Sequence, residues 1–381
     1  MENFDPISII IISLGAFALP LLAQKIKIPG IVLEIAFGLA IGPLLGLVST
    51  SEFISGMAML GFFLLMFLSG FEIELETFEN KGIKQLATPL FIFIGTIILS
   101  LIVVNILGYN LFLALVLGTT SVGIVVPLLR GDERIKTEYG QLIFLSAILA
   151  DFLTLILATI YASFTRTGGF TIQNFNVAIY FIVILIILTI LRRAAWWYPN
   201  MFTRLFDPDD PDELGIRTSL AMMLSLVGLS VLFNVEPILG AFLAGTVFAL
   251  VFPNRGTLET SLKGFSYGFL IPIFFINVGL NYDIEILSNR SFYSEVAVLF
   301  VVALLVKFLP ALIMFFFSIK IRDIFAAGFL LSARFSLIIA MAEIGVELGL
   351  IDAVLEAEII FLAALTATFA PIGYRIFSSK K

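Results

Sequence analysis

The sequence predicts an all-α membrane protein that crosses the bilayer many times. Of its 381 residues, 60% are hydrophobic and only 13% are charged, and the mean hydropathy is +1.11. A soluble protein of this length would need more charged side chains to cover its surface. The apolar runs last about 17–25 residues, which is the length of a helix that crosses the hydrocarbon core. The fold class is therefore polytopic and helical.

Several classes of chemistry are excluded by composition. The chain contains no cysteine and no histidine, so disulfides, thiolate chemistry, Cys/His zinc sites and imidazole pH switches are absent. No nucleophile–base pair or phosphate-binding loop is recognisable, and we expect neither an enzyme nor a bound cofactor. The amino terminus, Met1–Asp5, is acidic and has no basic signal-peptide region, so the first apolar run is expected to be a retained helix.

Thirteen apolar segments are expected to be transmembrane helices. In chain order they cover residues 6–23, 29–48, 53–71, 86–107, 111–129, 139–163, 173–191, 215–233, 236–252, 262–280, 293–318, 323–347 and 355–376.

The basic residues predict the orientation of these segments. Of the 22 Lys and Arg residues, eighteen fall on one side of the membrane in a thirteen-span arrangement. Only Arg166 and Arg290 fall on the other side, while Lys307 and Arg334 lie inside spans. Because basic loops remain in the cytoplasm, this division places the amino terminus outside and the carboxy terminus inside.

Polar groups recur near the middle of four spans. Asp151 is the only charged residue in its apolar stretch, and a bare carboxylate at bilayer depth is costly unless it is protonated, paired or bound to a cation. The stretch 118–123 combines two glycines with the hydroxyl residues Thr119, Thr120 and Ser121, which weakens a helix. The other two features are Lys307, three residues before Pro310, and the stretch Ser332, Arg334 and Ser336.

Two of these spans occupy matching places in the two halves of the chain. Span 5 and span 12 are each the fifth of six, and they run in opposite directions. Interrupted helices in corresponding positions are typical of inverted-repeat transporters, whose site lies near the midplane between the repeats. We therefore predict two broken helices that cross at the midplane, with their helix ends and unwound carbonyls available to a cation.

Each feature also has a purely structural interpretation. Gly, Ser and Thr in membrane helices often serve close packing, so Thr119–Ser121 by itself is weak evidence of a site. Asp151 can be a structural partner of Lys307 or Arg334, and Arg334 can neutralise the carbonyl ends of a broken helix. Four polar features at one depth on repeat-related elements favour transport when they are taken together.

Further acidic residues lie nearer the ends of spans. Glu34 and Glu72 lie within about one turn of the predicted cytoplasmic face, where they would line a funnel that leads to the site. Glu236, Glu343 and Glu347 lie near the outer ends of their spans. For all five, an ordinary position at the membrane–water interface is the simpler interpretation.

The chain resembles the monovalent cation:proton antiporter-2 family of Kef- and Nap-type antiporters over residues 8–376. The resemblance is carried by five motifs in order, namely Ile28–Pro43, Leu65–Ile73, Thr119–Leu129, Leu239–Gly245 and Pro272–Leu280. It implies thirteen helices, a dimerising scaffold and a mobile core. By analogy the scaffold would be residues 1–85 and 214–290, the core 86–171 and 291–381, and a linker helix with a cytoplasmic loop 172–213.

The chain departs from this family at three positions. Electrogenic members carry two adjacent acids where this chain has Ala150-Asp151, so only the second acid is present. Lys307 aligns with the family's core lysine, whose partner is the missing first acid. Span 12 usually reads Arg-Gly-Glu where this chain has Arg334-Phe-Ser336.

These features predict a secondary active transporter that exchanges one monovalent cation, Na⁺ or K⁺ and by extension Li⁺, for one proton. Asp151 would bind either the cation or the proton but never both. The further cation ligands would be Thr120, Ser121 and backbone carbonyls, with Thr119 in the same binding set. The residues that would support the helix crossing are Lys307, Arg334, Ser332 and Ser336. Exchange through one carboxylate predicts electroneutral 1:1 stoichiometry by alternating access.

Two alternatives stay open from the sequence. One is an organic-anion/cation symporter on a related fold, in which Lys307 and Arg334 face the substrate. The other is a transport-inactive membrane sensor or assembly subunit. The expected partners are the cation, the proton, the plasma-membrane bilayer, a second copy of the chain and a separate cytoplasmic regulatory subunit, without any nucleic acid.

Overall fold

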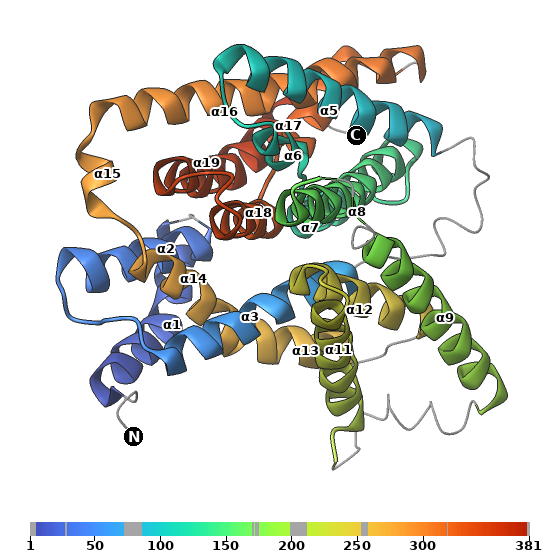
Figure 1. Cartoon of the computed structure of the whole chain (residues 1–381). Helices are drawn as coiled ribbons and strands as arrows, with labels where there is room; N and C mark the ends of the chain where they lie inside the picture. Colours follow the sequence, from blue (N-terminus) through green and yellow to red (C-terminus); the bar gives the residue numbers. More distant parts are fainter. Residues whose placement is uncertain are drawn as a thin grey trace. The chain divides into compact units, whose positions relative to one another are not determined.

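The computed structural model consists of helices and their connections, and no strand occurs in the part of the chain that it describes (Figure 1). The chain forms two compact units, each built from two stretches of sequence. The first unit comprises Met1–Leu75 and Gly169–Ile284, and the second comprises Glu76–Gly168 and Glu285–Lys381. The described residues are 5–26, 29–71, 86–169, 171, 175–198, 212–252, 258–317 and 319–378.

The first unit consists of apolar helices that follow the predicted segments. In chain order these are α1 (Pro6–Ile26), α2 (Gly30–Leu39) with the π-helical η1 (Ala40–Leu44), α3 (Glu52–Phe71), α9 (Phe175–Trp197), α11 (Leu214–Leu232), α12 (Pro237–Val251), α13 (Leu258–Phe265), η5 (Ser266–Leu270) and α14 (Ile271–Leu280).

Helices α3 and α12 pack against each other at two glycines. A Cβ atom added to Gly70 would lie 2.0 Å from the carbonyl oxygen of Phe242, and one added to Gly245 would lie 1.9 Å from that of Phe67. Small residues allow the backbones of membrane helices to approach this closely, which compensates for the weak hydrophobic drive between helices in lipid. The aromatic rings of Phe67 and Phe248 complete the contact at a centroid distance of 6.1 Å.

Gly245→Ala is expected to destabilise this packing. The new methyl group would push apart two backbones that cannot move independently, at an expected cost of about 1–3 kcal/mol. Thermal denaturation of the detergent-purified protein measures the effect. Gly228→Ala in α11 is the matched control, because no atom lies within 4 Å of a Cβ at that position. Equal melting temperatures for the two variants would contradict the proposed packing role.

The second unit contains the two broken helices. Its elements are α5 (Ala87–Leu107), α6 (Phe112–Gly118), α7 (Val122–Gly131), α8 (Glu138–Thr167), α16 (Arg290–Ala311), η6 (Leu312–Phe317), α17 (Ile321–Leu331), α18 (Ser336–Glu347) and α19 (Ala353–Phe377). The short helix α15 (Ile284–Ser288) lies where the first unit passes into the second.

Many of the expected transmembrane segments are long apolar helices. Among the described residues, ten helices are long and apolar enough to cross a membrane, and the count rises to eleven if the bent pair α17–α18 is taken as one span. Two further expected spans correspond to shorter apolar helices, Gly30–Leu44 and Pro237–Val251. The polytopic helical class is therefore confirmed, while thirteen membrane crossings and the orientation of the termini stay predictions.

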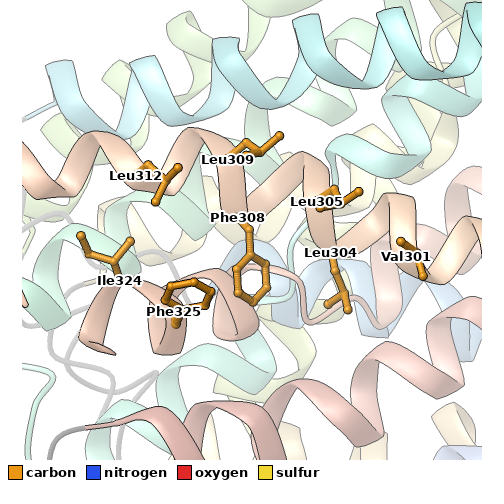
Figure 2. Close-up of a pocket in the computed structure, with 8 residues that line it drawn as sticks. All are labelled: Val301, Leu304, Leu305, Phe308, Leu309, Leu312, Ile324 and Phe325. Atoms are coloured by element: carbon orange, nitrogen blue, oxygen red, sulfur yellow. The ribbon is translucent and has the colours of Figure 1, made fainter. Parts of the chain in front are cut away.

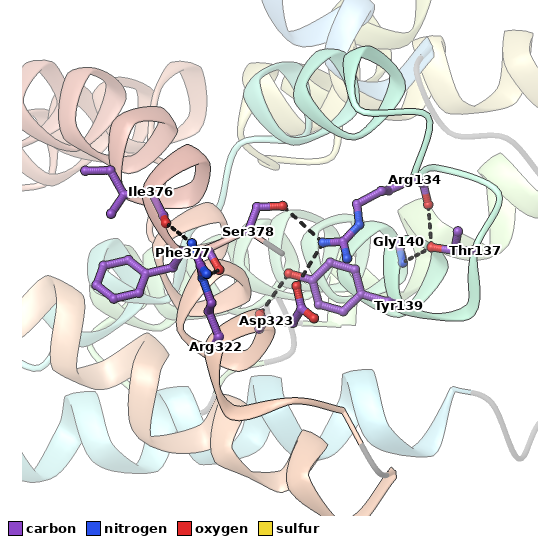
Figure 3. A network of polar contacts seen from close by, with 9 residues as sticks. All are labelled: Arg134, Thr137, Tyr139, Gly140, Arg322, Asp323, Ile376, Phe377 and Ser378. Atoms are coloured by element: carbon purple, nitrogen blue, oxygen red, sulfur yellow. Dashed lines mark hydrogen bonds and ion pairs between the residues drawn. The ribbon is translucent and has the colours of Figure 1, made fainter. Parts of the chain in front are cut away.

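A polar network ties together one end of the second unit (Figure 3). Arg134, in the connection between α7 and α8, forms an ion pair of 3.0 Å with Asp323 near the start of α17. The same guanidinium nitrogen donates to the hydroxyl of Ser378, which follows α19, at 3.1 Å. The hydroxyl of Tyr139 donates to the carbonyl oxygen of Asp323 at 2.8 Å, and Arg134 lies over the Tyr139 ring. Three elements distant in sequence are thereby joined.

The Arg134–Asp323 pair is expected to contribute more stability than an exposed pair of equal length. Its side chains are only 16% and 10% exposed, so water competes little, and a hydrogen bond between charged groups is worth about 1.5–3 kcal/mol in such places. The Lys263–Glu259 pair in α13 also measures 3.0 Å but is 36% and 40% exposed, with an expected coupling of about 0.3–0.5 kcal/mol. Double-mutant cycles on both pairs, read by thermal denaturation, compare them directly; a coupling no larger for Arg134–Asp323 would contradict the expectation.

An apolar pocket of about 330 Å³ lies on the second unit between α16, η6 and α17 (Figure 2). Its walls are aliphatic and aromatic side chains such as Phe308, Leu309 and Phe325. No charged or hydrogen-bonding side chain lines it, so it offers nothing to a small cation.

Candidate functional site

The two helix breaks contact each other inside the second unit. The first break, residues 119–121, separates α6 from α7, and the second, residues 332–335, separates α17 from α18. The backbone N–H of Ser121 donates to the carbonyl oxygen of Ala333 at 2.8 Å, and the hydroxyl of Thr120 donates to that of Leu331 at 3.1 Å. At the two breaks, backbone groups that have no partner within a helix are thus hydrogen-bonded across to the other break.

Asp151 comes from the middle of α8 and reaches the first break. Its side chain is 6% exposed, and its Oδ1 accepts a hydrogen bond of 3.1 Å from the backbone N–H of Thr120. Thr120 precedes Ser121, the N-cap residue of α7. The positive end of a helix dipole therefore lies beside the carboxylate.

Lys307 comes from α16 and also contacts Thr120. It is 2% exposed, and its Nζ donates to the carbonyl oxygen of Gly118 at 2.6 Å and to Thr120 Oγ1 at 2.8 Å. Thr120 therefore lies between the two charges: its backbone N–H binds Asp151, while its hydroxyl accepts from Lys307. Since Gly118 ends α6, the ammonium group also lies at the negative end of that helix.

Arg334 lies in the second break and is fully buried. Its Nη1 donates to the carbonyl oxygen of Ser332 at 3.0 Å, and its Nη2 donates to those of Leu117 at 2.7 Å and Ala303 at 3.1 Å. These carbonyls come from the end of α6, from α16 and from the break itself. The guanidinium thereby supplies donors to carbonyls at the two helix breaks and an additional donor to Ala303 inside α16.

The remaining hydroxyl residues of the predicted site divide into two groups. The hydroxyls of Thr119 and Ser332 donate at 2.7 Å to backbone carbonyls of their own helices, at Val116 and Gly328. Ser121 is 3% exposed and, among the described residues, its hydroxyl makes no hydrogen bond, so it is available to a ligand. Ser336 is the first residue of α18 and is 8% exposed.

Four of the five additional acidic residues lie among the described residues. Glu34 lies in α2 of the first unit and is 5% exposed, and Glu72 lies outside the described residues. Glu236 is buried at the N-cap of α12, also in the first unit. Glu343 is exposed, and Glu347 faces Arg166 at 3.6 Å.

Sequence reasoning missed Thr154. It lies on α8 three residues after Asp151, and therefore on the same helix face. It is fully buried, and its hydroxyl has no hydrogen-bond partner among the described residues. A Cβ added to Gly118 would lie 3.2 Å from this hydroxyl, so Thr154 borders the end of α6. The three-residue spacing from Asp151 was the signal that could have identified it.

The crossing offers one carboxylate, hydroxyl groups and helix-end carbonyls within a protein-enclosed space. Hard oxygen ligands of this kind suit an alkali cation. The described residues contain no group of three or more His, Cys, Asp or Glu side chains that could hold a metal ion.

Comparison with known proteins identifies the family to which the chain belongs. The model of the transmembrane sodium/hydrogen exchanger family matches residues 9–379. One relative, from Bacillus subtilis, is named as the Na⁺/H⁺ antiporter YjbQ. It is 33% identical to this chain over 98% of the chain's length. Na⁺/H⁺ antiporter 3 of Methanocaldococcus jannaschii is 27% identical over the whole chain and 98% of its own length, and the Na⁺/H⁺-K⁺ antiporter GerN of Bacillus cereus is 26% identical over 92% of the chain and 90% of its own.

The fold is shared with a solved antiporter. The structure of the sodium proton antiporter MjNhaP1 from Methanocaldococcus jannaschii aligns with a TM-score of 0.67, over 97% of this chain and 95% of that one, at 14% identity. The chain spans 63% of the length of the B. subtilis relative. With a family match over nearly all of its residues, this multi-pass membrane protein belongs to the sodium/hydrogen exchanger family of transporters.

Proposed function

We propose that the chain exchanges a monovalent cation, Na⁺ or K⁺ and by extension Li⁺, for a proton. The observation that carries the proposal is Asp151: one buried carboxylate, held by a backbone N–H where two broken helices meet. The family match and the antiport assigned to the named relatives support the same reaction.

Competition at one carboxylate would produce the exchange. When Asp151 is ionised, its oxygen atoms, the Ser121 hydroxyl and carbonyls of the breaks supply ligands for a dehydrated cation. When it is protonated, the cation has lost its counter-charge and leaves. The Thr120 hydroxyl already accepts from Lys307 and donates to Leu331, so it would join the cation only after Lys307 moves. The backbone N–H of Thr120 serves instead to position the carboxylate.

The charge count gives the stoichiometry. One carboxylate that carries one positive charge in each direction moves no net charge per cycle, provided that Lys307 keeps its proton. Membrane potential, worth about 2.3 kcal/mol per charge per 100 mV, would then not drive transport. The missing acidic partner at Ala150 supports this electroneutral 1:1 reading.

The two compact units suggest how the site moves. We propose that the second unit, which contains both breaks, is the mobile core, and that the first unit is a scaffold through which two copies dimerise. We also propose that the chain crosses the plasma membrane thirteen times, with its amino terminus outside. The same proposal includes a separate regulatory subunit and membership of the monovalent cation:proton antiporter-2 family. The two units, the charge distribution and the five sequence motifs support it.

Proton efflux from acid-loaded proteoliposomes tests the proposal. A pH dye inside the vesicles would report alkalinisation as Na⁺, Li⁺ or K⁺ is added outside, first at zero potential and then with an imposed potential. We expect at least one cation to evoke alkalinisation whose end point is independent of voltage. A voltage-dependent end point would overturn electroneutral exchange, and no response to any cation in well-incorporated protein would overturn antiport.

A further inference from the structure

A second buried carboxyl group lies in the same unit, apart from the helix crossing. Glu358, in the second turn of α19, is 1% exposed. Its neighbour Glu295 lies near the start of α16 and is half-buried. Lys307 lies twelve residues further along α16, about 18 Å along the helix axis, so this pair is separate from the Asp151 site.

Glu358 has no hydrogen-bond donor in the described structure. Both of its carboxyl oxygens are buried and unpartnered. The side chain within hydrogen-bonding reach is the carboxyl group of Glu295. Two ionised carboxylates are both acceptors and cannot bond to each other, so a hydrogen bond between them requires a proton on one of them.

The surroundings of the pair are acidic rather than basic. Tyr109, in the connection between α5 and α6, has its pKa raised by burial and then by the nearby charges of Glu358, Glu295 and Asp352. Asp352 is the N-cap of α19, and its carboxylate accepts from the backbone N–H of Leu355 at 2.8 Å. Within the described part of the chain, neither Glu295 nor Glu358 forms an ion pair with Lys or Arg.

Burial of two ionised carboxylates side by side would be costly in two ways. Each loses its hydration, and the two charges repel each other in a medium of low polarity. A single shared proton removes one charge and creates a hydrogen bond to the other oxygen. A metal ion is a weaker explanation, because the described residues hold no group of three acidic, His or Cys side chains arranged to bind one.

We propose that Glu295 and Glu358 hold one proton between them at neutral pH, as a proton-binding site separate from Asp151. Glu295 and Glu358 would hold this proton whether or not the chain transports a cation through Asp151. It joins α16 to α19 next to the edge-to-face contact of Phe292 with Phe361, whose ring centroids lie 5.8 Å apart. Loss of the proton at alkaline pH leaves like charges in that contact. The stability of α16, the helix that carries Lys307, would therefore fall as the pH rises.

Infrared spectroscopy of the purified protein tests the protonation directly. At neutral pH the wild type should show the C=O band of a protonated carboxyl group, shifted in D₂O, that is lost in E358Q. The band should persist in D151N, which separates this site from the transport site, and in the exposed control E347Q. A spectrum of E358Q that keeps the whole band would show that Glu358 is ionised and would overturn the proposal. E295Q provides a second variant, in which the band should change in position because its hydrogen-bond partner has changed.

The dependence of stability on pH gives an independent measurement. The melting temperature of the wild type should fall as the pH rises from about 4.3, the ordinary pKa of Glu, until the folded protein releases the shared proton. Over that range the folded state holds a proton that the unfolded chain has already lost. E358Q, which has no proton to lose at this position, should show a smaller fall. Stabilisation of the wild type by Na⁺ or K⁺ at fixed pH, lost in E358Q, would overturn the proposal in favour of a cation site. Equal slopes in both proteins would overturn it as well.

Discussion

Asp151→Asn is expected to reduce cation-evoked proton movement to the level of protein-free liposomes. The amide has nearly the same shape and its oxygen can still accept from the Thr120 N–H, so the helix crossing should keep its structure. It cannot bind a proton at physiological pH and has no charge to hold a dehydrated cation. The variant therefore removes both ligands of the exchange with little loss of stability, which the pH-dye assay and thermal denaturation measure together.

Glu138→Gln is the matched control for this result. Glu138 lies at the start of the same helix, α8, but is exposed to solvent. The same loss of one negative charge there should leave transport near the wild-type rate. Residual exchange by Asp151→Asn at a substantial rate would mean that the cation and the proton bind elsewhere. A large fall in its melting temperature would instead assign Asp151 the structural role.

Arg334→Ala is expected to produce the largest loss of stability at the site. Removal of the guanidinium leaves the carbonyls of Ser332 and Leu117 at the helix breaks without their buried donor, and it removes an additional donor from Ala303 inside α16. Each buried acceptor that loses its partner costs about 1–3 kcal/mol, and the lost side chain also leaves a cavity. We expect a fall of many degrees in the melting temperature of the detergent-purified protein, or failure to accumulate in the membrane.

Arg334→Lys should rescue little of this loss. A lysine carries one compact ammonium group, whereas the arginine fork reaches carbonyls on three separate segments. Arg166→Ala is the control, because Arg166 is 37% exposed and its 3.6 Å pair with Glu347 is worth about 0–1 kcal/mol. A stable Arg334→Ala protein that lost only the uptake of an organic anion would favour the symport alternative.

The sequence by itself determined the class of the protein and most of its helices. A bilayer requires each spanning segment to satisfy its own backbone hydrogen bonds, so length and hydropathy are enough to locate apolar helices. Because spanning segments are otherwise apolar and helical, charged residues and helix breaks inside them are easy to recognise in the sequence. Asp151, Lys307 and Arg334 stood out because a charge at membrane depth is rare, and the two breaks because glycine and hydroxyl residues interrupt the apolar pattern.

The partner of each polar group was decided only by the tertiary structure. Thr120 was expected to be a ligand, yet its hydroxyl is occupied by Lys307 and Leu331 while its backbone N–H holds Asp151. Thr154 drew no notice in the sequence, although the end of α6 brings Gly118 against it. Glu295 and Glu358 are not singled out by the sequence, and only the packing of α16 against α19 brings them together. Local periodicity fixes which face of a helix a residue occupies, but contacts between helices distant in sequence depend on how the whole unit packs.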